Sequence, residues 1–424
     1  MALAASVSLG KFFARNGPLQ TAHSGYEYRP GQIEMATAVA EALEERRHLF
    51  IEAGTGTGKT LAYLLPVLQS GRRVLLSTGT RNLQEQLVTK DVPLLANALG
   101  HELTVICMKG RQNYACKQKI ADFHSQPGLL ERDEYDMLTR IRAWAAETET
   151  GDQAELDFLP ENHPLWQRLN ARRETCTGQK CPQYDSCFLT SLHQRAAAAD
   201  MVVVNHHLFF ADLRLKGQDL AGVLPPYEAV VFDEAHELEA IAGQYFGIGV
   251  SSHQIEDLAR DASAHLKMLD LASPDMDARI EYVRLAAQKF FMCFGAREGR
   301  TVFEERPRFV QDHAEIYDQY MGSLAYLQSG LDAIHDKPEE VHNLMRRAGD
   351  LRQQTAYIVE SEDEGVVYWV ERRGRGVHLQ ASPIEVAALL RDQLFDKTDT
   401  VIMTSATLAV SGGFEYVRGR LGVE

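Results

Sequence analysis

Short apolar runs recur along the chain. Between several of them lie stretches in which the apolar residues have the spacing of a helix. The apolar runs occupy residues 48–53, 73–78, 103–108, 201–205, 229–234 and 400–405. Uninterrupted runs of this kind are typical of strands in a parallel sheet that helices cover on both faces. Helical spacing follows a turn within 26–43, and it recurs at 61–69 and from Asn82 to about Thr89. Strands and helices in alternation predict a doubly wound α/β domain.

Two long segments interrupt this pattern. Residues 108–195 hold four of the six cysteines, and residues 245–392 are polar and mostly helical in period, with the best strand signal at 366–370. Loops of this length without structure of their own are uncommon inside a compact domain. We therefore expect both segments to be inserted subdomains.

Composition narrows the class of protein. The 424 residues have room for about two to four domains, and 45% of them are apolar, which suffices for several cores. The net charge of -15 argues against a generally basic surface for nucleic acid, although basic residues gather between 108 and 123. No apolar stretch is long enough to span a membrane, and the N-terminus lacks the basic start of a signal peptide. We expect a cytoplasmic protein without a membrane partner.

One glycine-rich segment has the spacing of a phosphate-binding loop. Residues 53–60 read AGTGTGKT, with alanine in place of the first glycine, and they lie between an apolar run and a helical one. The glycines let the backbone wrap a phosphate, with loop amides pointing inward at a helix N-terminus. The lysine should reach the β and γ phosphates, and the last threonine should bind Mg²⁺. The predicted ATP site comprises Ala53, Gly54, Thr55, Gly56, Thr57, Gly58, Lys59 and Thr60.

A second segment, VVFDEAHE at 230–237, ends an apolar run with acidic residues. Ligands of open α/β sheets bind at the carboxyl ends of the strands, and this run delivers Asp233 there. We expect Asp233 to hold Mg²⁺ through water and Glu234 to orient and deprotonate the attacking water. His236 would link the nucleotide site to a nucleic-acid side, and Lys59 completes the expected catalytic set. The alternative is a helix N-terminus that merely favours acidic residues.

The phosphate loop and the Asp-Glu-Ala-His box together resemble those of superfamily 2 helicases. Four further segments are similar to helicase motifs: RPGQ (29–32) to the adenine-recognition motif, STGTRNLQEQL (77–87) to motif Ia, NHHLFF (205–210) to the strand end ahead of the box, and TSATL (404–408) to motif III. The set resembles the XPD/DinG family of iron–sulfur DNA helicases, and most closely its bacterial DinG-like branch.

This resemblance implies an ATP-dependent DNA helicase that moves 5′→3′ on single-stranded or forked DNA during repair or replication. It implies that Gln32 reads the adenine and that Thr80 and Asn205 touch DNA. An RNA substrate is the alternative, which the Asp-Glu-Ala-His box alone would permit and which the cysteine-bearing segment disfavours by resemblance.

Four cysteines have spacings that suggest a metal site. Fifty-nine residues separate Cys116 from Cys176, four separate Cys176 from Cys181, and five separate Cys181 from Cys187. Four thiolates can hold Zn²⁺ or an iron–sulfur cluster, and the spacing alone leaves both possibilities open. The segment KGRQNYAC (109–116) resembles the one that carries the first cluster ligand in the DinG-like branch, which implies a [4Fe–4S] cluster on these four residues.

Basic and aromatic residues surround the first of these cysteines, and such a mixture suits single-stranded nucleic acid. The predicted DNA contacts are Lys109, Arg111, Asn113, Tyr114 and Lys117. The alternative is a solvated basic face with a tyrosine in the core.

The resemblance also implies an order of domains around one RecA-like P-loop lobe with a parallel sheet. Lobe 1 would comprise 1–107, 196–244 and the start of 393–424, an iron–sulfur domain would occupy 108–195, and a mainly helical arch would occupy 245–392. Residues 393–424 would also begin a second lobe, which we expect to be missing. That lobe would supply an arginine to the γ-phosphate. We therefore expect weak ATP turnover unless a second subunit supplies the arginine, and the alternative function is a fragment that binds DNA or a partner with little unwinding.

Overall fold

The computed structural model describes residues 7–423, except 55, 126–131, 161–162, 174, 218–221, 296 and 305. The chain divides into two compact units. The first unit comprises Met1–Ala242 together with Val386–Glu424, and the second comprises Gly243–Glu385. Each unit has its own sheet and its own core.

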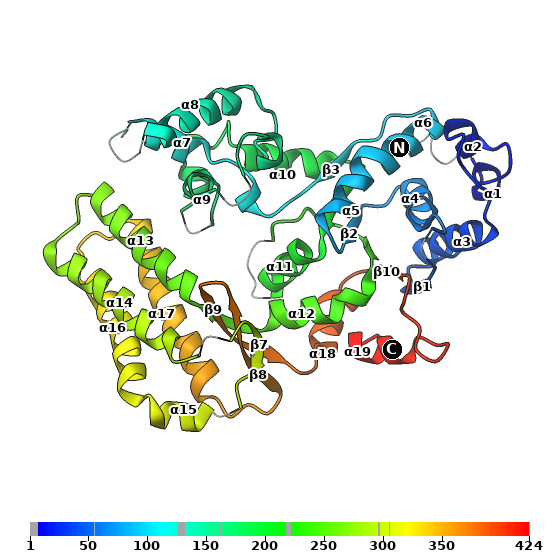
Figure 1. Cartoon of the computed structure of the whole chain (residues 1–424). Helices are drawn as coiled ribbons and strands as arrows, with labels where there is room; N and C mark the ends of the chain where they lie inside the picture. Colours follow the sequence, from blue (N-terminus) through cyan, green and yellow to red (C-terminus); the bar gives the residue numbers. More distant parts are fainter. Residues whose placement is uncertain are drawn as a thin grey trace. The chain divides into compact units, whose positions relative to one another are not determined.

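The first unit is built on a six-stranded sheet in which all neighbouring strands are parallel, in the order β1-β10-β5-β2-β4-β3. Figure 1 labels its strands β1, β2, β3 and β10. These six strands match the six apolar runs of the sequence. Their bounds are β1 Leu49–Glu52, β2 Val74–Thr78, β3 Val105–Cys107, β4 Met201–Asn205, β5 Ala229–Asp233 and β10 Thr400–Ser405.

Helices bury both faces of this sheet, which explains why its central strands are apolar at almost every position. Successive side chains of a strand point to opposite faces. On one face, Leu76 and Val231 share a core with the helices that flank the phosphate loop. On the other, the ring of Phe232 lies 4.8 Å from that of Phe209 and 6.4 Å from that of Phe210.

The helices that begin in the first unit are mostly short. Their bounds are α1 Leu9–Phe12, α2 Pro18–Ala22, α3 Pro30–Glu45, α4 Lys59–Gln69, α5 Arg81–Gln86, α6 Val92–Leu99, α7 Lys117–Ser125, α8 Arg132–Glu147, α9 Pro164–Leu169, α10 Phe188–Ala198, α11 His206–Gly217, α12 Leu238–Phe246, α18 Ala387–Leu390 and α19 Glu415–Leu421. Helices α7 to α9 pack around a small separate core that includes Ile141 and Trp166. The expected fold, an α/β lobe interrupted by inserted segments, is confirmed.

The second unit combines long helices with an antiparallel sheet. The helices are α13 Ser252–Met268, α14 Pro274–Met292, α15 Arg306–Asp312, α16 Ala314–Asp332 and α17 Glu339–Glu360. Their core includes Phe290, whose ring stacks on Tyr320 at 4.4 Å. The sheet has the order β6-β9-β8-β7, with β6 Ile248–Ser251, β7 Gly299–Val302, β8 Val366–Arg373 and β9 Gly376–Pro383.

This second sheet corrects one detail of the sequence analysis. The strand signal at 366–370 corresponds to β8, but β6, β7 and β9 were not expected. All four residues of β7 are exposed, so no apolar pattern marks it, and β8 supplies its hydrogen-bond partners. The predicted division of the chain into five domain segments stays a prediction. The contacts between residues divide the described chain into two units, with boundaries after Ala242 and before Val386.

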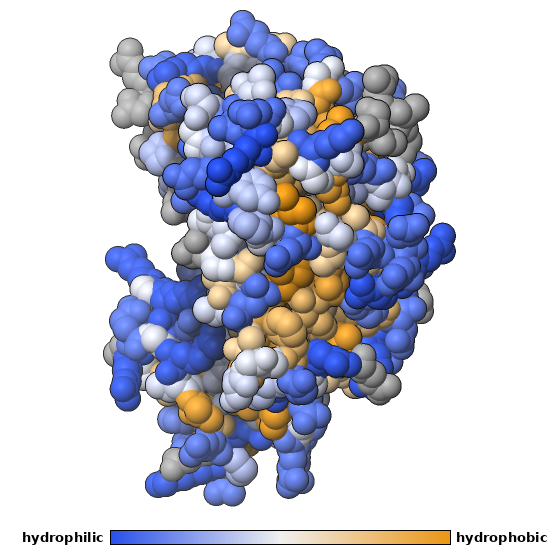
Figure 2. Space-filling view, turned by 90° about the vertical axis from the view of Figure 1, so that its right-hand side faces the viewer, coloured by the Kyte–Doolittle hydropathy of each residue, from blue (hydrophilic) through white to orange (hydrophobic). Residues whose placement is uncertain are grey.

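The face drawn in Figure 2 is mostly hydrophilic. Figure 2 shows apolar residues gathered in the middle of the face that looks to the right in Figure 1, with hydrophilic residues around them. Among the described residues, none of the helices has both the length and the apolar character needed to cross a bilayer.

Candidate nucleotide-binding site

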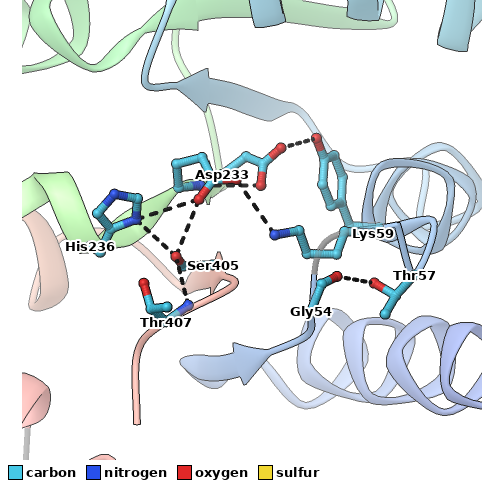
Figure 3. Close-up of polar contacts among 9 residues, drawn as sticks. Gly54, Thr57, Lys59, Asp233, His236, Ser405 and Thr407 are labelled. Carbon is cyan, nitrogen blue, oxygen red and sulfur yellow. Dashed lines mark hydrogen bonds and ion pairs between the residues drawn. The ribbon is translucent and has the colours of Figure 1, made fainter. Parts of the chain in front are cut away.

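The carboxyl ends of three neighbouring strands bring the predicted catalytic segments together. The phosphate loop follows β1, the Asp-Glu-Ala-His box ends β5, and the TSATL segment ends β10 between them. The strand register aligns Glu52 with Ser405 and Thr404 with Asp233. Residues that are far apart in the sequence therefore face one another in Figure 3.

The phosphate loop has the backbone that its glycines allow. Gly56 and Gly58 have φ angles of 79° and 80°, in the left-handed region that favours glycine. The Thr57 hydroxyl donates to the carbonyl oxygen of Gly54 at 2.9 Å (Figure 3). Lys59 is the first residue of α4, so its side chain starts at the helix N-terminus. Thr55 lies outside the described residues.

Gln32 contacts this loop. Its side-chain nitrogen donates to the carbonyl oxygen of Gly58 at 3.0 Å, and its side-chain oxygen lies 3.0 Å from the Tyr26 hydroxyl. The guanidinium of Arg29 donates to the carbonyl oxygen of Gly56. Because Gln32 is only 3% exposed, it offers no open edge to an adenine in this structure.

Lys59 and the acidic pair face each other. The Lys59 Nζ atom lies 3.5 Å from Oε1 of Glu234. The buried Asp233 accepts a hydrogen bond of 3.1 Å from the Tyr63 hydroxyl. Burial first, and then the negative charge of Glu234, raise the pKa of Asp233 above its usual range. A divalent cation would compensate a buried carboxylate of this kind, so these groups fit a Mg²⁺ site.

His236 lies on the other side of Glu234, beside β10. Its Nδ1 atom is 2.9 Å from Oγ of Ser405 and 3.4 Å from a carboxylate oxygen of Glu234. The Ser405 hydroxyl donates to Glu234 at 3.3 Å and accepts from the backbone N–H of Thr407 at 3.3 Å (Figure 3). Glu234 has a φ of 61°, a conformation that costs energy outside glycine and is found at functional sites.

Several contacts of this site were not expected from the sequence. Tyr63 lies four residues after Lys59, one turn along α4, and that spacing could have indicated a shared face. Ser405 lies inside the TSATL segment, so its motif was noted but not its role. The contacts of Tyr26 and Arg29 with Gln32 and the loop had no local signal.

The residues predicted to touch DNA differ in their surroundings. Thr80 is exposed and caps α5 by accepting from the backbone N–H of Leu83 at 3.3 Å. Asn205 caps α11 by accepting from the backbone N–H of Leu208 at 2.7 Å. Thr80 follows β2 by two residues and Asn205 is the last residue of β4, so both lie at the carboxyl ends of strands, on the same sheet edge as the nucleotide site.

The predicted contacts around Cys116 are only partly exposed. Lys109 forms an ion pair of 2.7 Å with Asp152, and Lys117 lies over the ring of Phe188. Asn113 donates to the carbonyl oxygen of Gly110 at 2.8 Å, and Arg111 is half-buried.

Tyr114 needs a correction. It is 2% exposed, and its hydroxyl accepts from the backbone N–H of Lys109 at 3.0 Å. A ring in the core has no free face on which a base could stack, so the alternative of a core tyrosine describes this residue.

Among the four cysteines, Cys116 and Cys187 lie near each other. Cys116 and Cys187 border the same small apolar cluster, and Cys187 adds to the effect of burial in raising the pKa of the Cys116 thiol. Cys181 is half-buried and Cys176 is exposed. Within the described part of the chain, no three His, Cys, Asp or Glu side chains form a group that could hold a metal ion. The arrangement does not by itself form a four-thiolate site, and the cluster stays a prediction.

Comparison with known proteins finds helicases, as the motifs predict. The family model of DEAD/DEAH box helicases matches residues 32–137. The chain is 34% identical to the ATP-dependent DNA helicase YoaA of Haemophilus influenzae, over 98% of this chain and 65% of that protein. It is 29% identical to the ATP-dependent helicase DinG of Mycobacterium tuberculosis, over 93% and 62% respectively. A solved XPD helicase aligns with 94% of this chain and 61% of its own, at 15% identity and a TM-score of 0.47. The chain thus spans less than two thirds of these relatives.

Proposed function

Because the chain belongs to the XPD/DinG family of DEAD/DEAH-box helicases, we propose that it forms the ATP-binding part of an ATP-dependent DNA helicase. One observation carries the proposal: the phosphate loop, Asp233, Glu234 and Ser405 converge on one sheet edge. The finer proposal is movement 5′→3′ on single-stranded DNA in repair or replication, and it rests on family resemblance.

In this proposal, residues 53–60 cradle the triphosphate and Lys59 exchanges its contact with Glu234 for the γ-phosphate. Thr60 and Asp233 hold Mg²⁺, while Tyr63 fixes one oxygen of Asp233. Mg²⁺, when bound, neutralises charge on the phosphates. Glu234 orients and deprotonates the attacking water.

His236 and Ser405 hold the carboxylate of Glu234 in place in this proposal. Since Ser405 belongs to the segment that leaves β10, a displacement of that segment would reach Glu234 directly. This contact gives the proposed ATP site a physical connection to the rest of the motor.

The test compares nucleotide binding and ATP turnover, with and without single-stranded DNA, across variants of the 424-residue chain. Lys59→Ala should abolish binding of Mg²⁺–ATP. Glu234→Gln should keep binding and lose turnover by about 100-fold or more, because it removes the base. The exposed Lys397→Ala is the matched control and should behave as the wild type. Equal binding by the wild type and Lys59→Ala would refute the proposal.

The proposed DNA contacts are Thr80, Asn205, Lys109, Arg111, Asn113 and Lys117. Among them, Lys109 already has a carboxylate partner, so Arg111→Ala and Lys117→Ala should weaken binding to single-stranded DNA more than Lys109→Ala does. The affinity of these variants should also depend less on salt concentration, because a protein that contacts fewer phosphates releases fewer counterions when it binds DNA. Unchanged DNA affinity in all three variants would exclude this surface.

We also propose a [4Fe–4S] cluster on Cys116, Cys176, Cys181 and Cys187, supported by the family and by the proximity of Cys116 and Cys187. The protein purified without oxygen should contain iron and acid-labile sulfide, and serine at any of the four positions should reduce both. Cys293→Ser is the control. Zinc in place of iron would favour the other metal that four thiolates can hold.

A further inference from the structure

Glu52, the last residue of β1, binds the segment that leaves β10. One of its carboxylate oxygens, Oε2, accepts from the backbone N–H groups of Leu408 at 2.6 Å and of Ala409 at 2.5 Å. The residue before them, Thr407, donates its N–H to the hydroxyl of Ser405 at 3.3 Å (Figure 3). Two successive N–H groups that point at one oxygen favour a negative charge there. A carboxylate therefore suits this position.

The charge of Glu52 strengthens this contact, although the side chain is exposed to solvent. The N–H groups of Ala409 and Leu408 stabilise the charged form, so they lower the pKa of Glu52 below its usual range. A hydrogen bond to an ionised oxygen is about twice as strong as one between neutral groups. The segment after β10 is thus bound to the end of β1 by two charged hydrogen bonds.

The same two strands are also joined ahead of this contact. The backbone N–H of Ala53 donates to the carbonyl oxygen of Ser405 at 3.0 Å, and the strand register places Glu52 beside Ser405. Ser405 is fully buried, and its hydroxyl donates to Glu234 at 3.3 Å. The chain is therefore bound to β1 on both sides of the bend at 406–407, and the first of these two points carries the hydroxyl that reaches the proposed base.

The orientation of the Ser405 hydroxyl depends on this bend. A serine hydroxyl has one proton to donate and can also accept hydrogen bonds, so its acceptor contacts help to decide where the proton points. The N–H of Thr407 is such a contact, and Nδ1 of His236 lies 2.9 Å from the same oxygen. Because Glu52 holds the two residues that follow Thr407, it keeps that N–H in place. Without Glu52, the hydroxyl would be freer to turn away from Glu234.

We propose that Glu52 is a positioning residue for hydrolysis: by holding the segment after β10, it keeps the Ser405 hydroxyl on Glu234. This inference rests on the proposed ATP site. Its described hydrogen bonds go to the amides of Leu408 and Ala409 rather than to the phosphate loop. Glu52 should therefore control the rate of hydrolysis and leave the affinity for Mg²⁺–ATP unchanged.

The experiment measures, in the 424-residue chain, the affinity for Mg²⁺–ATP and the rate at which bound ATP is hydrolysed in a single turnover. Glu52→Ala should keep the affinity within about twofold of the wild type and slow hydrolysis about tenfold, because a misplaced catalytic group costs rate. Glu52→Gln should have an intermediate rate, since its amide oxygen can accept from the same N–H groups without the charge. Glu102→Gln changes another exposed carboxylate of the first unit and should behave as the wild type.

A further pair of variants separates positioning from a general loss of structure. Ser405→Ala lacks the hydroxyl, so adding Glu52→Ala in that background should slow hydrolysis by less than about twofold more, as expected for residues that act through one contact. Hydrogen exchange without nucleotide should be faster in Glu52→Ala at the amides of Thr407, Leu408 and Ala409. Exchange in β2 and β5 should stay at its wild-type rate, because the core of the sheet is intact.

Three results would overturn the inference. A wild-type rate of hydrolysis in Glu52→Ala, with faster exchange in the segment, would show that the contact has no part in hydrolysis. Equal losses of affinity and rate would assign Glu52 to the phosphate loop. A full additional loss in the Ser405→Ala background would show that Glu52 acts without Ser405. If the wild-type chain binds no Mg²⁺–ATP, the proposed function fails and this inference fails with it, while hydrogen exchange shows separately whether Glu52 holds the segment.

Discussion

Alanine at Gly58 should destabilise the first unit far more than alanine at Gly56. Both glycines are left-handed, so an alanine at either position costs about 1–2 kcal/mol. At position 56 a Cβ would meet open space, whereas at position 58 it would collide with the side-chain nitrogen of Gln32. The displaced amide loses its hydrogen bond and stays buried, which costs about 1–3 kcal/mol more. We expect a loss of about 1–2 kcal/mol for Gly56→Ala and about 2–5 kcal/mol for Gly58→Ala.

The assay is amide hydrogen exchange without nucleotide, followed on the β2 and β5 strands so that opening of the first unit is measured separately from that of the second. The double variant Gly58→Ala with Gln32→Ala removes the collision. It should therefore be more stable than the sum of the two single changes by about 1 kcal/mol. Equal losses at positions 56 and 58, or strict additivity in the double variant, would refute the contact on which this reasoning depends.

Three further predictions concern the same sheet edge. Tyr63→Phe should weaken Mg²⁺-dependent nucleotide binding about tenfold, measured by titration of Mg²⁺, because Asp233 loses the group that orients it. Burial lowers the pKa of His206 to about 4. The unfolded chain, with a pKa of about 6.5, therefore takes up the proton first, and stability falls by about 3 kcal/mol as the pH drops from about 6.5 to about 4. His206→Gln should remove this share of the acid sensitivity in urea unfolding. Glu52 accepts from the backbone N–H groups of Leu408 and Ala409, so Glu52→Gln should speed hydrogen exchange at those two amides.

The strands of the first unit could be predicted because burial on both faces leaves a mark in the sequence. Each central strand, such as β5 with all five residues buried, needs an apolar side chain at every position. Strand β7 of the second unit has no such pattern. Strand β7 is exposed throughout, and β8 supplies its hydrogen bonds from about seventy residues away along the chain. Such a strand is defined by its partner rather than by its own residues.

The composition of the segment around Cys116 did not predict where the Tyr114 side chain lies. The basic residues Lys109, Arg111 and Lys117 led to the prediction that Tyr114 between them contacts DNA. In the structure the backbone turns through Arg111–Asn113, and the Tyr114 side chain enters the core beside Ala171 and Leu189. The charges of neighbouring residues say little about where a ring points when a turn lies between them.

In the candidate site, the spacing of residues along the chain predicts which residues take part but not how they contact one another. The glycines, Lys59 and the Asp233–Glu234 pair were identified because the chemistry of phosphate binding fixes their types and local order. Their contacts depend on which strands are neighbours. β10 lies between β1 and β5, and only this order brings Ser405 within hydrogen-bonding distance of Glu234. It also brings the amides of Leu408 and Ala409 to Glu52, more than 350 residues away in the sequence. Since no spacing in the chain encodes that order, the members of the site follow from the sequence, whereas the hydrogen-bonded network among them follows from the register of the sheet.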